Sequence, residues 1–242
     1  MNRAMYAAAT GMAAQQINLD TVANNLANAD VAGFKGAAAS FTDLAAPGSV
    51  GFGTASIGSH TIFEQGKLMK SGGPFDLAID GSGFFAVRNA KGERAYTRDG
   101  EFSRDSGGRL RNAQGWVLDG VRIPAEATTV SVAPDGLTTA QTPRGAVVCG
   151  RIRLAEFAAP ERLESIGGTL FRTTQQSGSA AFVNAGAERG PHIKFGMLEH
   201  SNVSIIESMM EILAAQRAYE ANAKGVQAAD EMLRIANNLN RG

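Results

Sequence analysis

Both ends of the chain carry apolar residues that repeat every seven positions, a period that predicts a helix packed along its length against another helix. The N-terminal repeat has a first row of Met5, Met12, Leu19 and Leu26 and a second row of Ala8, Val22 and Ala29. The first 40 residues contain four charged side chains, at Arg3, Asp20, Asp30 and Lys35. A helix that faces water on one side carries more charge than this, so we expect more than one of its faces to meet protein.

The C-terminal repeat is longer and is preceded by a helix start signal. Ser204 and Glu207 form an S-x-x-E capping box, in which the two side chains bond free N–H groups at the start of a helix. The pattern predicts one continuous helix of about 35 residues, or about 50 Å at 1.5 Å per residue. Its first row is Ile205, Ile212, Tyr219, Val226 and Leu233, and its second row is Met209, Gln216 and Ala223.

The middle of the chain has a different pattern, of short alternating or aromatic runs separated by glycine-containing turns. Examples of the runs are FDLAI (75–79), GFFAV (83–87) and RIRLAEF (151–157). Turn signals between such runs include Asp80-Gly81, Asp99-Gly100, Asp119-Gly120 and Asp135-Gly136. Short strands with frequent turns of this type predict an antiparallel β-rich domain.

The expected fold class is therefore α+β, with long N- and C-terminal helices that pair as a coiled coil and a central antiparallel β-rich domain. The expected boundaries are an N-terminal helix at 1–34, an extended linker at 35–73, the β domain at 74–180, a return linker at 181–203 and the C-terminal helix at 204–242.

The sequence leaves two arrangements open for the terminal helices: a pair within one chain, or packing that is completed against other copies. Helices of this kind obtain most of their stability from packing, so a single pair would be marginal. Lys+Arg and Asp+Glu are equal at 23 each, and charged residues are 19% of the chain, below the usual quarter or so. Such a surface favours self-association, and it lacks the basic field that would recruit nucleic acid or an anionic membrane.

The segment ANNLANADVAGFKG (23–36) places three asparagines at the end of an alanine-rich helix. Asparagine is a poor residue inside a helix, because its amide competes for backbone hydrogen bonds. We expect the amides of Asn24, Asn25 and Asn28 to bond backbone groups where the helix ends and to reach a neighbouring helix. We expect Gly33 to supply a turn and Phe34 to anchor the chain as it leaves for the β domain.

No pattern of catalytic or metal-binding residues is present. The two phosphate-binding glycine motifs, G-x-G-x-x-G and G-x-x-x-x-G-K-[ST], are both absent from the sequence. The three histidines and the single cysteine are scattered along the chain, which does not fit a zinc site. Asp76 and Asp80 would lie about 13 Å apart on a strand, farther than the roughly 5–9.5 Å that glycosidases use. The chain is therefore expected to have no catalytic, cofactor-binding or metal site and no cofactor.

No transmembrane run of 18 apolar residues is present, and the N-terminus lacks the apolar core of a signal peptide. The chain is expected not to span a membrane. A cytoplasmic location and export by a route that cleaves no leader both fit this expectation.

Taken together, these segments resemble the rod–hook family of bacterial flagellar axial proteins. The terminal blocks are the most specific, since the family shows an NNLAN core followed by GFK near one end and a characteristic helix at the other. The resemblance spans nearly the whole chain in the expected order. The similar blocks are 8–36, 74–87, 95–102, 150–174 and 198–233.

Within the family the chain is most similar to distal-rod members, with the proximal-rod members as the alternative. The large additional insertion of the hook members does not fit in 242 residues. In the segment ADVAGFKG (29–36), Val31-Ala32 stands where the family more often has a threonine or serine. The segment TDLAAPGSVGFGTAS (42–56) is shorter than that of distal-rod members, so the subtype stays open.

The resemblance implies a structural subunit that polymerises through its terminal helices into a hollow helical shaft and transmits torque to the hook. It also implies the partners: further copies in an open helical polymer, other rod and hook proteins, and the flagellar type III export apparatus. The implied location is the basal body, in the rod that crosses the periplasm, after export without a cleaved signal. The expected interface residues are Met5, Met12, Leu19, Val22, Leu26, Ile205, Met209, Ile212, Tyr219, Val226 and Leu233.

One alternative of a different class is a secreted β-domain binding module whose terminal helices form a closed coiled-coil oligomer. An open polymer grows without limit, whereas a closed oligomer stops at a fixed mass. The two can therefore be separated by measuring how mass depends on concentration.

Overall fold

The computed structural model describes residues 3–44, 53–187 and 190–239, and within these ranges the chain forms two compact units. The first, here called the helical unit, is built from 1–28, 36–62 and 203–242. The second, the β unit, is built from 29–35 and 63–202. Each unit therefore contains segments that are far apart in the sequence, so the two chain ends come together in one of them.

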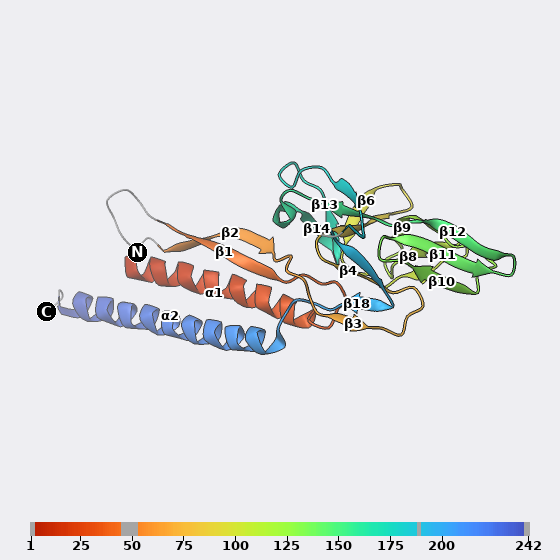
Figure 1. Cartoon of the computed structure of the whole chain (residues 1–242). Coiled ribbons are helices and arrows are strands. Elements are labelled where there is room, and N and C mark those ends of the chain that lie inside the picture. Colours follow the sequence, from red (N-terminus) through yellow and green to blue (C-terminus); the bar gives the residue numbers. More distant parts are fainter. Residues whose placement is uncertain (1–2, 45–52, 188–189, 240–242) are drawn as a thin grey trace. The chain divides into compact units, whose positions relative to one another are not determined.

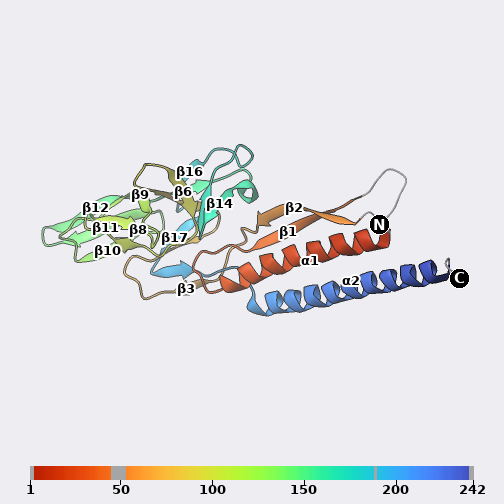
Figure 2. The ribbon, with the colours of Figure 1, turned by 180° about the vertical axis from the view of Figure 1, so that it is seen from behind.

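The helical unit contains α1 (Arg3–Ala27) and α2 (Ile205–Leu239), which pack side by side along their lengths (Figures 1 and 2). Alanine and other good helix formers dominate both segments. At the start of α2, the N–H of Glu207 donates to Ser204 Oγ at 3.4 Å, which is the backbone half of the expected capping box. The two terminal helices of the predicted α+β fold are confirmed.

The N-terminal helix ends earlier than the sequence indicated. Helix α1 stops at Ala27, whereas the helical pattern continued to residue 34. Residues 29–35 belong instead to the β unit, where their backbone makes other hydrogen bonds. The N–H of Gly33, for example, donates to the carbonyl of Glu199 at 2.7 Å. These contacts outweigh the helical preference of the alanines, which is a weak local effect.

The extended linker expected at 35–73 is wrong: two strands of a β-hairpin in the helical unit and strand β3 (Leu68–Lys70) of the β unit lie in this range, and residues 45–52 lie outside the described residues. Strand β1 (Ala37–Asp43) pairs antiparallel with β2 (Thr54–Thr61), and both strands contact α1 (Figure 1). Thr54 N lies 3.3 Å from Thr10 Oγ1 on α1 and donates to it. A glycine-rich hairpin has little core of its own, so its position depends on this packing against the helix.

The β unit confirms the predicted antiparallel β-rich domain. Its largest sheet has twelve strands within the described ranges, and two further strand pairs, β17–β4 and β18–β3, complete the unit. The strands are β3 (Leu68–Lys70), β4 (Leu77–Asp80), β5 (Phe84–Arg88), β6 (Arg94–Thr97), β7 (Ser103–Arg104), β8 (Arg109–Arg111), β9 (Val117–Arg122), β10 (Thr129–Val132), β11 (Leu137–Thr142), β12 (Gly145–Arg151), β13 (Arg153–Glu156), β14 (Glu164–Gly167), β15 (Leu170–Arg172), β16 (Ala181–Asn184), β17 (His192–Phe195) and β18 (Met197–Glu199).

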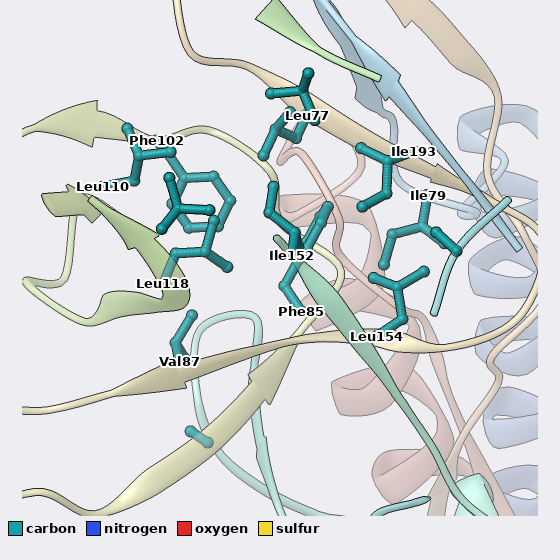
Figure 3. Close-up of a cluster of buried hydrophobic side chains, with 14 of the residues drawn as sticks. Leu77, Ile79, Phe85, Val87, Phe102, Leu110, Leu118, Ile152, Leu154 and Ile193 are labelled. Atoms are coloured by element: carbon teal, nitrogen blue, oxygen red, sulfur yellow. The ribbon is translucent and has the colours of Figure 1, made fainter. Parts of the chain in front are cut away.

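Two apolar clusters hold the β unit together. Alternation along β5 sends Phe85 and Val87 into the larger cluster and Phe84 and Ala86 into a smaller, aromatic one. The larger cluster is shown in Figure 3, where side chains from strands far apart in sequence converge. Its labelled members are Leu77, Ile79, Phe85, Val87, Phe102, Leu110, Leu118, Ile152, Leu154 and Ile193.

Two local expectations about this region are wrong. Residues 181–203 are not a return linker, because they contain β16, β17 and β18, which pair with β13, β4 and β3. Asp119-Gly120 is not a turn, because it lies inside β9. A Cβ on Gly120 would stand 2.5 Å from the carbonyl oxygen of Arg151 on β12, so this glycine permits a close approach of two strands.

Candidate assembly surface

On α1, the side chains of the predicted repeat are buried to different extents. Val22 is the most enclosed, at 4% exposed. The first-row residues Met5, Met12, Leu19 and Leu26 are half-buried. A half-buried apolar side chain keeps free surface for another partner, so the helical unit alone does not satisfy this row.

On α2, the buried row is not the second row read from the sequence. The enclosed residues are Ser208, Ala215 and Ala229, at intervals of seven and fourteen, with half-buried Asn222 in register. Met209 and Gln216 are exposed instead. The reason is close helix approach: a Cβ on Gly11 of α1 would lie 3.0 Å from Asn222 Nδ2, which leaves room for small side chains only.

The large apolar residues displaced from this contact cover the start of α2. Ile206 is 74% exposed and Met210 is 65% exposed, although both are strongly apolar. Ile212 and Val226 of the predicted row are half-buried, whereas the side chain of Leu233 lies outside the described residues. A run of exposed apolar side chains of this size is typical of a surface that binds another protein. Its exposed members are Ile205, Ile206, Met209, Met210, Leu213 and Tyr219.

The three asparagines at the end of α1 act mainly within the helical unit. Asn25 bonds both backbone groups of Ala37: its Nδ2 donates to the carbonyl at 2.7 Å and its Oδ1 accepts from the N–H at 2.9 Å. Asn28 Nδ2 donates to the carbonyl of Asn24 at 2.8 Å, which satisfies a free carbonyl of the last turn. The partner of Asn25 is strand β1, not a neighbouring helix. Asn24 itself is exposed.

Gly33 occupies a position that other residues cannot adopt without strain. Its φ is +66°, and a Cβ there would stand 2.2 Å from the backbone nitrogen of Asp99. The segment therefore packs directly on the backbone that follows β6 in the β unit. Phe34, its neighbour, is half-buried.

We predict that Gly33→Ala lowers the free energy of unfolding of the β unit by about 2 kcal/mol or more, from φ strain plus the clash. The matched control is Gly92→Ala, which has φ +85° but nothing within 4 Å of the new Cβ and should cost only about 1 kcal/mol. Urea unfolding followed by fluorescence of Trp116, the one tryptophan of the chain, measures both. Equal losses in the two variants would contradict close packing at Gly33.

A buried ion cluster joins three distant segments of the β unit beside Gly33. Glu199 is fully buried, and its Oε1 lies 2.5 Å from Lys35 Nζ while its Oε2 accepts from Arg98 Nη1 at 3.2 Å. The N–H of Gly66 also donates to Oε1, at 2.9 Å. Lys35 Nζ has a second acceptor in the carbonyl of Glu64, at 2.6 Å. The cluster therefore ties the segments entering and leaving the β unit to its interior.

Burial shifts the pKa values of both cations of the cluster and of a neighbouring carboxyl group. It lowers the pKa of Lys35, an effect that the carboxylate of Glu199 opposes and the charge of Arg98 reinforces. Burial likewise lowers the pKa of Arg98. Burial raises the pKa of the neighbouring Asp99 carboxyl to about 6, although the N–H of Glu101 donates to it. Two cations share one carboxylate here, so the cluster depends strongly on Glu199.

Sequence reasoning missed this cluster, because its members are separated by up to 164 positions. Lys35 did stand out as one of few charges in an apolar, glycine-rich stretch. A lysine in such a stretch indicates a buried partner, but nothing in the sequence identifies which carboxylate it is.

Comparison with known proteins assigns the chain to a family. Three family models match it: the flagella basal body rod protein at residues 5–35, the flagellar hook protein FlgE/F/G D1 domain at 78–140, and the flagellar basal body rod FlgEFG protein C-terminal at 195–239. The flagellar basal-body rod protein FlgG of Borreliella burgdorferi is 39% identical to it over the full length of both chains. The chain belongs to the flagellar basal-body rod protein family.

Other members of the rod protein family show the same full-length match. FlgG of Caulobacter vibrioides is 36% identical over 98% of this chain and 99% of that protein, and FlgG of Bacillus subtilis is 33% identical over the whole of both. The rod protein FlgF of Caulobacter vibrioides is 34% identical over 98% of this chain and 97% of that protein.

The family consists of structural proteins of the flagellar basal body and not of enzymes, so the chain is a structural rod subunit. The full-length relatives named above are FlgG proteins at 33–39% identity and one FlgF protein at 34% identity. Neither of the helices in the described ranges is long and apolar enough to cross a membrane.

Proposed function

We propose that the chain polymerises through α1 and α2 into a hollow helical shaft that transmits torque to the hook. The observation that carries this proposal is the exposed apolar face at the start of α2, beside a contact that already uses the small residues of that helix. The packing of α1 against α2 within one chain buries one face of α2, and a second face of α2 is apolar and exposed. Further copies of the same helices are the partner that fits it.

The pairing of α1 and α2 is best described as a short coiled coil. Ser208, Ala215, Asn222 and Ala229 form one row, and half-buried Ile212 and Val226 lie in the other, each four residues after a member of the first row. That spacing is the seven-residue repeat of helices that cross at a shallow angle. In the polymer, the half-buried side chains of α1 and the exposed ones of α2 would pack against neighbouring copies.

The proposal includes the route and the partners that the family resemblance implies. The subunit would be exported by the flagellar type III apparatus without a cleaved signal, and the rod that it forms would cross the periplasm. It would contact other rod and hook proteins at the ends of its own segment. Identity to FlgG proteins supports the distal segment, while 34% identity to an FlgF keeps the proximal segment as the second candidate.

Light scattering of the purified full-length chain at increasing concentration tests the mode of assembly. An open helical polymer continues to gain mass with concentration, because head-to-tail contacts do not close. A mass that stops at a small fixed number of copies would instead indicate the closed coiled-coil oligomer of a binding module. Electron microscopy of the products distinguishes a hollow tube from an irregular aggregate.

A further inference from the structure

The two ends of the strand pair β5–β13 in the β unit are lined by different types of side chain. The strands are antiparallel, with Leu154 opposite Phe85 and Ala155 opposite Phe84. The start of β5 and the end of β13 therefore lie together, and so do the end of β5 and the start of β13. Each end opens into its own pocket, one lined by aromatic residues and a carboxylate and the other by arginines.

The first pocket, here called the Glu156 pocket, has a volume of about 420 Å³. Aromatic rings form much of its wall: Phe84 contacts Phe63 and Phe157 edge to face, with centroid distances of 5.2 and 5.6 Å. Glu156 accepts a hydrogen bond from Ser82 Oγ at 2.6 Å, and it forms no ion pair with any described residue. An aromatic wall with an unpaired carboxylate is suited to a cationic side chain, which both groups attract.

One arginine, Arg98, also lines the Glu156 pocket, but it is committed elsewhere. Its Nη1 donates to Glu199 and its Nη2 donates to the carbonyl of Gly81 at 2.8 Å. It is 4% exposed, so its guanidinium belongs to the buried ion cluster. Among the described residues, Glu156 therefore has no cation paired with it, although the guanidinium of Arg98 lies in the pocket wall.

The second pocket, here called the arginine pocket, has a volume of about 130 Å³ and contains four arginines. Arg88 and Arg94 lie directly opposite each other on β5 and β6, an unfavourable pairing that Asp119 relieves at 2.7 and 3.8 Å. Arg151 pairs with Asp135 at 2.9 Å. The pocket therefore holds more positive charge than its carboxylates neutralise.

Arg153 is the remaining arginine, and it has no ion pair among the described residues. Its guanidinium carbon lies 5.2 Å from the centre of the Phe182 ring, which Arg94 also contacts at 5.5 Å. The ring holds the side chain at the surface without neutralising it. A cation in this state gains most from a carboxylate supplied by another molecule.

Arg153 and Glu156 do not pair within one copy. They are three residues apart on an extended strand, so their side chains leave β13 on opposite faces. Any contact between the two must therefore join different copies. Because it links two different surfaces of the same chain, such a contact is heterologous and can repeat from one copy to the next.

We propose that the Glu156 pocket of one copy receives Arg153 from the arginine pocket of the next copy, giving the β units a head-to-tail contact of their own. This inference rests on the proposed self-assembly through α1 and α2 and adds a second contact that sets the order of the β units. The charge pair fixes register, and the aromatic wall excludes water around it.

Charge reversal and restoration test the contact. The experiment uses the full-length chain at low salt and measures the protein concentration needed for polymer growth. Glu156→Arg and Arg153→Glu are each expected to raise this concentration by about tenfold. The double variant restores an opposite-charge pair and should need nearly the same concentration as the unaltered chain. The matched controls, Glu126→Arg and Arg144→Glu, reverse charges at exposed positions outside both pockets and should change little. Raising the salt concentration should narrow the difference between single and double variants.

Several outcomes would overturn the proposal. One is growth of both single variants at the original concentration, and another is a double variant no better than the singles. Faster growth of Glu156→Arg would show that the pocket prefers an anion. In each case Val22→Asp, a change in the helical unit alone, tests the proposed self-assembly separately. If this variant stops polymer growth, assembly through the helices stands even where the contact between β units fails. If the unaltered chain does not grow at all, the proposed self-assembly fails and this contact fails with it.

Discussion

Glu199→Leu is expected to lower the free energy of unfolding of the β unit by about 3–5 kcal/mol, one of the two largest effects that the structure predicts. The substitution leaves Lys35 and Arg98 buried without their shared carboxylate, and it removes the acceptor of the Gly66 N–H. Neutralising or exposing two buried cations accounts for the cost. Urea unfolding followed by Trp116 fluorescence measures it, because this residue packs against the larger cluster of the β unit.

Two controls separate the loss of the ion cluster from the loss of a glutamate. Glu126→Leu removes an exposed carboxylate and should change stability by less than about 0.5 kcal/mol. Replacing all three members with apolar residues (Lys35→Met, Arg98→Leu and Glu199→Leu together) should recover most of the loss, because no unpaired charge then remains buried. A loss below about 1 kcal/mol for Glu199→Leu alone would show that the cluster contributes little.

Val22→Asp is expected to prevent growth of the polymer while the β unit still folds. Val22 is 4% exposed, so the new carboxylate must either be buried without a partner or force the helical unit apart. A penalty of about 3 kcal/mol would raise the concentration needed for assembly by a hundredfold or more. Leu26→Asp, one turn later on the half-buried row, should have the same direction and a smaller effect.

The measurement combines light scattering for growth with Trp116 fluorescence for the β unit. Ala90→Asp adds the same charge to an exposed turn of the β unit and should leave growth unchanged. Growth of Val22→Asp to normal size would contradict assembly through the terminal helices. Loss of the Trp116 signal would instead show that the two units do not fold separately.

Much of the helical unit could be predicted, because helix formation is read from local residues. The seven-residue period and the Ser204–Glu207 cap place the start of α2 within one residue of its observed start at Ile205, and residues 240–242 of the predicted helix lie outside the described residues. The second row of the α2 repeat was predicted wrongly, because a large apolar residue such as Met209 is expected to be buried. The structure instead buries Ala215 and Ala229, because close helix approach selects small side chains.

The β unit was predictable in class but not in pairing. Alternating runs and glycine turns identify strands, yet they do not tell which strands are neighbours. Residues 181–203 looked like a linker because their strands are short and pair with β13, β4 and β3, far back in the chain. Strand pairing is a non-local choice, and single-strand patterns carry little information about it.

The sequence by itself determined the α+β class, the terminal helices and the family, because these depend on periodicity and on motifs whose residues are close along the chain. Tertiary structure alone decided where α1 stops, which face of α2 is buried, and that Lys35 and Arg98 share Glu199. Those features depend on groups more than a hundred positions apart, whose interaction energies exist only once folding has brought them together.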